Sequence, residues 1–148
     1  MLKILLPFDG SEASLNSVRH ALQLVRSGLT ASFVLANVQT PATLYEWITL
    51  HDPEAIEQLS EAVAARVLAP AEALLNEAKV EWEPAVANGD PGHVLAEMIE
   101  LHGVDAVIMG ARGLGAAKGL LVGSVSQWLL QHAAVPVTVV HPSAADDD

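Results

Sequence analysis

The sequence predicts an α/β fold: an open, doubly wound, parallel sheet of five strands with helices on both faces. Short apolar runs alternate with amphipathic helical patterns along the 148 residues. The connections between them are short, as in sheets whose strands all run in one direction. Two of the runs lack polar alternation, which is typical of strands buried on both faces. A chain of this length has room for one domain.

The five strands are predicted at residues 3–8, 32–38, 80–86, 106–110 and 135–140. The fourth begins Ala106-Val107-Ile108-Met109, and the fifth reads Val135-Pro136-Val137-Thr138-Val139-Val140. In such a sheet, ligands bind beyond the carboxyl ends of the strands that flank the point where the winding reverses. Polar or glycine-rich segments follow the first and the fourth strands, which makes these two strand ends the candidate site.

Helix start and stop signals bracket the amphipathic patterns between the strands. The first helix has Ser11 as its N-cap and Gly28 as its stop, and its apolar stripe is formed by Leu15, Val18, Leu22 and Val25. The second opens at Asp52-Pro53, and its stripe is formed by Ile56, Leu59, Val63 and Val67. We expect Pro70 to kink or break this helix. The third runs from Asp90-Pro91 to Gly103, and the last begins at Gly123-Ser124.

The charge balance excludes several classes of partner. Eighteen acidic and seven basic residues give a net charge of −11, whereas nucleic-acid binders present basic faces to phosphates. We therefore expect no nucleic-acid partner. No apolar run approaches the ~18–20 residues of a membrane-spanning helix, and no secretory signal is visible, so we expect no membrane association and a cytoplasmic location. The lack of cysteine excludes disulfides and thiolate metal sites.

The first candidate strand end is the segment Pro7-Phe8-Asp9-Gly10-Ser11. It places the Asp9 carboxylate next to the start of a helix. There it can accept a hydrogen bond from a ribose hydroxyl or bind a metal ion on a phosphate. It can equally serve only to cap the helix. The segment by itself does not decide between these roles.

The second candidate strand end is a loop with five glycines among residues 110–123. Glycines let a backbone approach a phosphate closely, and free N–H groups beside the helix start at Ser124 form an anion site. Arg112 and Lys118 add positive charge. The loop is neither a P-loop, since no Gly-Lys-Ser/Thr closes it, nor the dinucleotide fingerprint, since it follows the fourth strand. The alternative is a flexible linker.

In combination these segments resemble the universal stress protein family. The spacing Gly110-x-x-Gly113, nine residues, Gly123-Ser124 is similar to the phosphate motif of its ATP-binding branch, and the segments 4–12, 122–126 and 135–140 resemble the same family. The resemblance implies a sheet order of 3-2-1-4-5 and a bound ATP with Mg²⁺. It also implies that Asp9 contacts the ribose, or a magnesium ion that the nucleotide carries. The cofactor-binding residues it implies are Pro7, Asp9, Val38, Met109, Gly110, Arg112, Gly113, Gly123, Ser124, Val125 and Ser126. Two residues depart from the usual motif. Ala111 stands where a serine or threonine hydroxyl is common, and Gly119 stands where a larger, often basic side chain is common.

Three functions remain open at this point. They are an ATP-binding regulatory module of the stress response, a slow ATPase, and a nucleotide-free dimeric interaction domain. The six histidines have no metal-ligand spacing, and no base is visible near Ser124, so we expect neither a metal centre nor an enzyme beyond very slow hydrolysis. Tyr45 and Trp47 are candidates to cover either the second helix or the adenine.

We further expect a homodimer that pairs through the last strand, Val135 to Val140, because that strand lacks the charges that protect an exposed edge. A regulatory protein partner is also expected, of a kind that the sequence does not identify. The predicted domain covers residues 1–142, and residues 143–148 are expected to form an acidic flexible tail.

Overall fold

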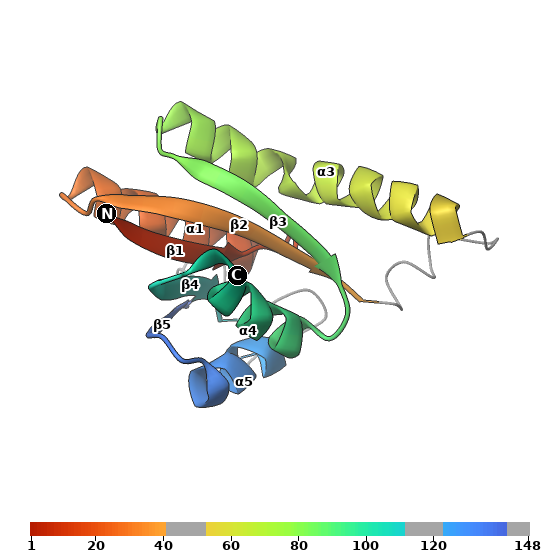
Figure 1. Ribbon diagram of the computed structural model, residues 1–148. Helices are drawn as coiled ribbons and strands as arrows, with labels where there is room; N and C mark the ends of the chain where they lie inside the picture. Colours follow the sequence, from red (N-terminus) through yellow and green to blue (C-terminus); the bar gives the residue numbers. More distant parts are fainter. Residues whose placement is uncertain (41–52, 112–122, 142–148) are drawn as a thin grey trace.

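The computed structural model describes residues 1–40, 53–111 and 123–141, with the backbone alone for residues 53–58. Strands and helices alternate along the chain, as predicted (Figure 1). In chain order the elements are β1 (Leu2–Pro7), α1 (Glu12–Arg26), β2 (Ala31–Gln39), α3 (Pro53–Glu77), β3 (Trp82–Asn88), α4 (Pro91–His102), β4 (Ala106–Gly110), α5 (Ser124–His132) and β5 (Val137–Val140).

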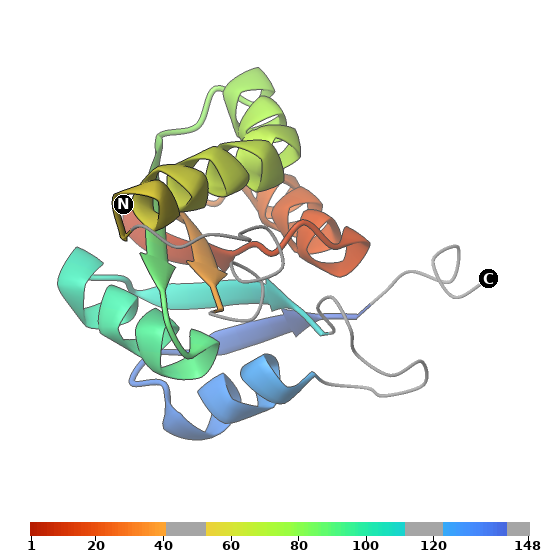
Figure 2. The ribbon, with the colours of Figure 1, turned by 90° about the vertical axis from the view of Figure 1, so that its right-hand side faces the viewer.

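The strands form one sheet in the order β3-β2-β1-β4-β5, and every neighbouring pair is parallel. This confirms the predicted fold class and strand order. β1 lies in the middle, and its Leu5 is paired with Val34 of β2 on one side and Val107 of β4 on the other. Helices α1 and α3 cover one face of the sheet, and α4 and α5 cover the other (Figure 2). None of the helices in the described parts of the chain is long and apolar enough to cross a membrane.

Alternate side chains of the central strands enter two separate cores, because successive residues of a strand point to opposite faces. Ile4 and Leu6 of β1 pack on the face that carries α1 and α3, where Leu75 of α3 is also fully buried. Leu5 enters the other core and packs with Leu129 of α5. Burial on both faces explains why these strands are almost continuously apolar.

The helix caps follow the sequence signals. The Ser11 hydroxyl accepts the N–H of Ser14 at 3.2 Å, and the Asp90 carboxylate accepts the N–H of His93 at 3.3 Å. Gly28 and Gly103 follow their helices with positive φ angles of 117° and 63°, as left-handed stops do. Asp52, the cap expected for α3, lies outside the described residues.

Several boundaries differ from the predicted ones. Helix α3 continues through Pro70 to Glu77, so of the predicted kink or break, the break was wrong. Its neighbours Leu68 and Ala71 are buried in the core on both sides of the proline, and this packing outweighs the missing hydrogen bond. β3 begins at Trp82 and β5 at Val137, each two residues later than expected.

Two glycines are needed where elements pack closely. A Cβ at Gly110, the last residue of β4, would lie 2.7 Å from the backbone of Ala13 in the first turn of α1. A Cβ at Gly92 in α4 would lie 2.9 Å from the indole of Trp128 in α5. The same indole stacks on the ring of His132, with centroids 4.3 Å apart. Gly92 therefore sets the distance between α4 and α5.

We predict that Gly92→Ala lowers the free energy of unfolding by about 1–3 kcal/mol, the usual cost of overpacking a well-filled contact. Urea denaturation measures the change. In a double-mutant cycle with Trp128→Leu, the smaller side chain should remove most of the cost of the added methyl group. Strictly additive costs in that cycle would show that the indole is not the obstacle.

Candidate functional site at the carboxyl ends of the central strands

The structure brings several predicted site residues to one edge of the sheet. Pro7 is the last residue of β1, Val38 lies near the end of β2, and Met109 and Gly110 end β4. Because β1 pairs in parallel with both β2 and β4, these carboxyl ends meet at the same edge. The Met109 side chain is buried in the core beneath α4 and α5. The edge therefore matches the place where ligands bind in doubly wound sheets.

Asp9 follows β1 at this edge and is held by the start of α1. Its Oδ1 accepts the N–H of Ser11 at 2.9 Å and the hydroxyl of Ser14 at 3.0 Å. The N-cap of the helix is Ser11, so Asp9 supports the cap without being the cap itself. Since Ala13 contacts Gly110, the turn that contains Asp9 lies beside the end of β4. The structure thus orients this carboxylate, and its contact with ribose or a metal stays a prediction.

A hydrogen-bonded clasp joins the two ends of the glycine-rich loop. The carbonyl of Ala111 accepts the N–H of Gly123 and, at 3.3 Å, the hydroxyl of Ser126. The same hydroxyl lies 3.0 Å from the carbonyl of Gly123. The N–H of Ala111 in turn donates to the carbonyl of Val140 in β5 at 2.9 Å. The start of α5 is thereby fixed next to the ends of β4 and β5.

This clasp changes the role expected of two site residues. Ser126 was predicted to surround phosphates, but only 2% of its surface is exposed and its hydroxyl faces backbone carbonyls. The N–H of Gly123 is likewise occupied by Ala111. Both residues position the loop ends. Arg112, Gly113, Lys118 and Gly119 lie outside the described residues, as do Tyr45 and Trp47.

The first turn of α5 differs from those of α1 and α4 because it has no side-chain cap. Its three leading N–H groups belong to Ser124, Val125 and Ser126. Within the described ranges, none of these N–H groups donates a hydrogen bond. Together with the partial positive charge of a helix start, they form a place suited to an anion.

Sequence reasoning missed a buried polar network that supports the same edge. Asn37 of β2 donates from Nδ2 to the carbonyl of Phe8 at 2.9 Å, just before Asp9. Gln39 bonds to Asn37 at 3.2 Å and exchanges two hydrogen bonds with Ser60 of α3, at 2.8 and 2.9 Å. The available signal was a pair of amides two residues apart in an otherwise apolar strand. Val38 lies between them and packs on the opposite face.

Known proteins resemble this chain in sequence and in fold over almost its whole length. The chain is 27% identical to universal stress protein YxiE of Bacillus subtilis, over 93% of this chain and 97% of that protein. A universal stress protein from Arabidopsis thaliana, solved with AMP bound, superposes with a TM-score of 0.72 at 21% identity and covers 98% of this chain and 94% of its own. A universal stress protein in complex with cAMP superposes with a TM-score of 0.59 at 24% identity, over 96% and 98% of the two chains.

The fold and these likenesses agree with a direct match to a family model. The model of the universal stress protein family matches residues 1–141, which is almost the whole chain. It includes both candidate strand ends, the clasp and the first turn of α5. This chain belongs to the universal stress protein family.

Proposed function

We propose that the site binds an adenine nucleotide, ATP with Mg²⁺, and that nucleotide occupancy regulates what the protein interacts with. The observation that carries the proposal is the uncapped start of α5, held by the clasp beside the strand end that presents Asp9. Relatives in the family are known with AMP and with cAMP bound. AMP and cAMP share the adenine, ribose and phosphate groups that ATP also presents to a protein.

The proposed contacts divide the nucleotide among three strand ends. The N–H groups of Ser124, Val125 and Ser126 would bind phosphate, with Arg112 and Gly113 contributing from the loop. Asp9 would bind the ribose or the magnesium ion. The Val38 backbone would hydrogen-bond adenine, and Pro7 and the backbone of Met109 would border the base and sugar. Asn37 supports this arrangement indirectly, because it ties β2 to the residue before Asp9.

We propose binding without efficient turnover. ATP hydrolysis needs a positioned water and compensation of charge on the γ-phosphate. The carboxylate at the site, Asp9, is engaged through Oδ1 with Ser11 and Ser14, which suits a positioning role. The protein would therefore act as a nucleotide-dependent module.

We also propose that the module is a homodimer paired through β5. The N–H of Val107 bonds to the carbonyl of Pro136, and that of Ala111 to Val140. In a parallel ladder this directs the N–H groups of Val137 and Val139 outward, to the outer edge of the sheet. Neither position has a charge or a proline to block pairing. A second copy would complete the ladder across a two-fold axis.

Isothermal titration of wild type with ATP should show binding that Asp9→Asn weakens by about 1–3 kcal/mol, the scale of a hydrogen bond to a charged group. Asparagine keeps an oxygen for Ser11 and Ser14, so the fold and the thermal midpoint should change little. Glu12→Gln serves as the matched control, because its side chain is 73% exposed on α1. Loss of thermal stability with unchanged affinity in Asp9→Asn would leave Asp9 as a support of the cap alone.

Light scattering at micromolar concentration should show a dimer that Val139→Pro converts to a monomer. Proline removes an outward N–H without breaking the ladder to β4. The matched control is Val86→Pro on the opposite edge of the sheet, where Val86 also directs its N–H outward. That variant should stay dimeric. A dimer unaffected by Val139→Pro, or a monomeric wild type, would rule out pairing through β5.

A further inference from the structure

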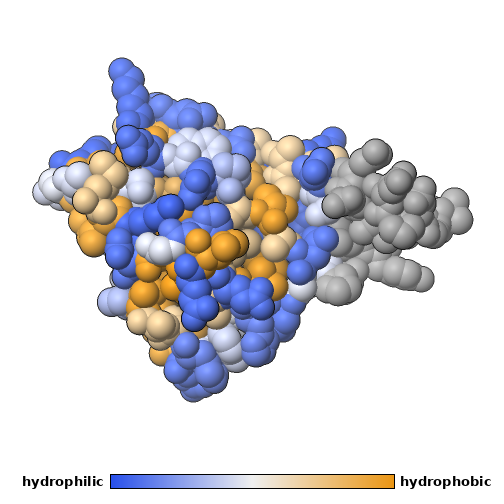
Figure 3. All heavy atoms as spheres, viewed as in Figure 1, coloured by the Kyte–Doolittle hydropathy of each residue, from blue (hydrophilic) through white to orange (hydrophobic). Residues whose placement is uncertain are grey.

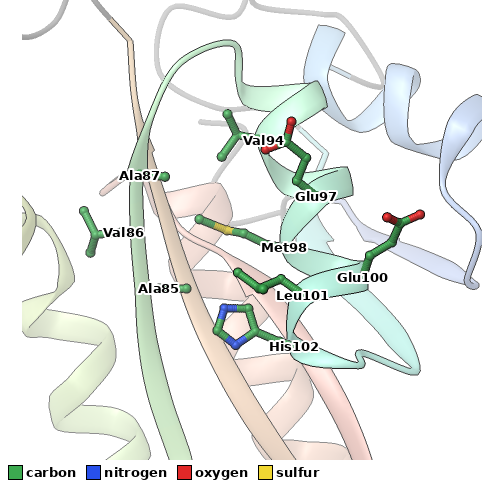
Figure 4. A pocket seen from close by; sticks show the side chains of 9 residues that line it. All are labelled: Ala85, Val86, Ala87, Val94, Glu97, Met98, Glu100, Leu101 and His102. Atoms are coloured by element: carbon green, nitrogen blue, oxygen red, sulfur yellow. The ribbon is translucent and has the colours of Figure 1, made fainter.

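A shallow groove of about 570 Å³ lies between β3 and α4, away from the strand ends that form the nucleotide site. Met98, Leu101 and His102 point from α4 toward β3, and Ala85 lies opposite them on the strand (Figure 4). Leu101 is 81% exposed, although it lies in a helix whose other side is core. Hydrophobic surface is visible over β3 and α4, with hydrophilic surface around it (Figure 3).

The edge beside this groove is protected from strand addition. The N–H of Phe33 bonds to the carbonyl of Glu81, and Phe33 is in register with Trp82. The backbone groups of residue 84 therefore point to the outer edge of the sheet. This residue is Pro84, which has no N–H to donate to an added strand. An extended peptide could not form a continuous ladder on β3. The occupant of the groove is thus expected to bind through side chains.

The length of the groove is suited to a helix. Its residues on α4 run from Val94 to His102, which is roughly 12 Å at 1.5 Å per residue. Two turns of a docked helix, with apolar anchors at i, i+3 or i+4, and i+7, span about 10 Å. A small molecule fits less well, because ligand pockets bury most of the ligand surface and Leu101 is largely exposed.

The charge beside the groove is negative and uncompensated. Glu97 and Glu100 project from α4 and are exposed, and neither has an ion pair within the residues that the structure describes. The neighbouring basic side chains are already engaged, since Lys3 Nζ and His102 Nδ1 lie 3.1 and 3.2 Å from Glu83 Oε1. Hydrogen bonds from Lys3, and secondarily from His102, hold the pKa of Glu83 below its usual value, so that carboxylate stays ionised. The whole chain carries a net charge of −11.

We propose that this groove binds a basic amphipathic helix of a partner protein. The apolar side chains of that helix contact Met98 and Leu101, and its lysine or arginine side chains lie against Glu97 and Glu100. Apolar contact provides most of the affinity, and charge complementarity provides orientation and selects basic partners over acidic ones. The inference does not depend on nucleotide binding, because it uses no residue of the nucleotide site.

The test uses the full chain and synthetic 18-residue peptides of leucine and lysine. In the first peptide the leucines recur at i, i+3, i+4 and i+7, the spacing of one helix face. In the second peptide leucine and lysine alternate. The third peptide keeps the leucine positions of the first and has glutamate in place of lysine. Fluorescence anisotropy at physiological salt should show the first peptide binding at least tenfold more tightly than the other two. Amide shifts on binding, measured by NMR, should centre on Val94, Met98 and Leu101.

Two variants and their matched controls locate the site. Leu101→Glu, and separately Glu97→Gln with Glu100→Gln, should each weaken binding of the first peptide at least fivefold. The controls place the same changes elsewhere on the surface, in Leu130→Glu on α5 and in Glu61→Gln with Glu77→Gln on α3. They should change the affinity less than twofold.

Several results would overturn the proposal. Equal weakening in the control pair would mean that the peptide responds to net charge alone. Equal affinity for the alternating peptide would exclude a helical partner. A molar mass that falls in Leu101→Glu would identify a second copy of this chain as the occupant. Failure of all three peptides to bind would remove the groove as a docking surface.

Discussion

The structure depends on one constraint, the burial of β1 on both faces and both edges. Leu5 is fully buried among β2, β4 and the α4–α5 core, while Ile4 and Leu6 fill the opposite core. A strand surrounded in this way can expose only its ends. The winding reverses at β1, so the helices that follow β1 and β4 pack on opposite faces and leave the carboxyl edge between them accessible. The candidate site lies there because the packing of the sheet leaves that place open.

Several residues at that edge serve the fold and the site together. Gly110 is needed because the backbone of Ala13 occupies the space that a side chain would fill. This packing requires glycine independently of any need for close approach to a phosphate. Ser126 and Gly123 close the loop onto Ala111, and no hydrogen bond within the described residues uses the N–H groups at the start of α5. Asp9 is oriented by Ser11 and Ser14. The proposed site would be preorganised, because hydrogen bonds within the protein already fix the groups that would face a ligand.

The two edges of the sheet differ in how they are protected, and the difference separates two kinds of interaction. β3 presents Pro84 outward and has α4 beside it, with a groove lined by Met98 and Leu101. β5 presents the outward N–H groups of Val137 and Val139 without a charge or a proline. The first edge is suited to side-chain contacts with a helix, and the second to backbone pairing with another strand. The proposed dimer and the proposed partner therefore use opposite ends of the molecule and can be present together.

Local sequence determined the helix caps at Ser11 and Asp90, the left-handed stops, and the five strands to within two residues, because these depend on propensity and on side-chain contacts between near neighbours. Periodicity also identified both strand ends of the candidate site, while the strand order came from the family resemblance. Tertiary structure decided the rest. Pro70 does not end α3 because the core holds the helix on both sides of it. The roles of Gly110, Ser126 and Asn37 depend on Ala13, Ala111 and Phe8, which are 97, 15 and 29 positions away along the chain and become neighbours only in the folded sheet.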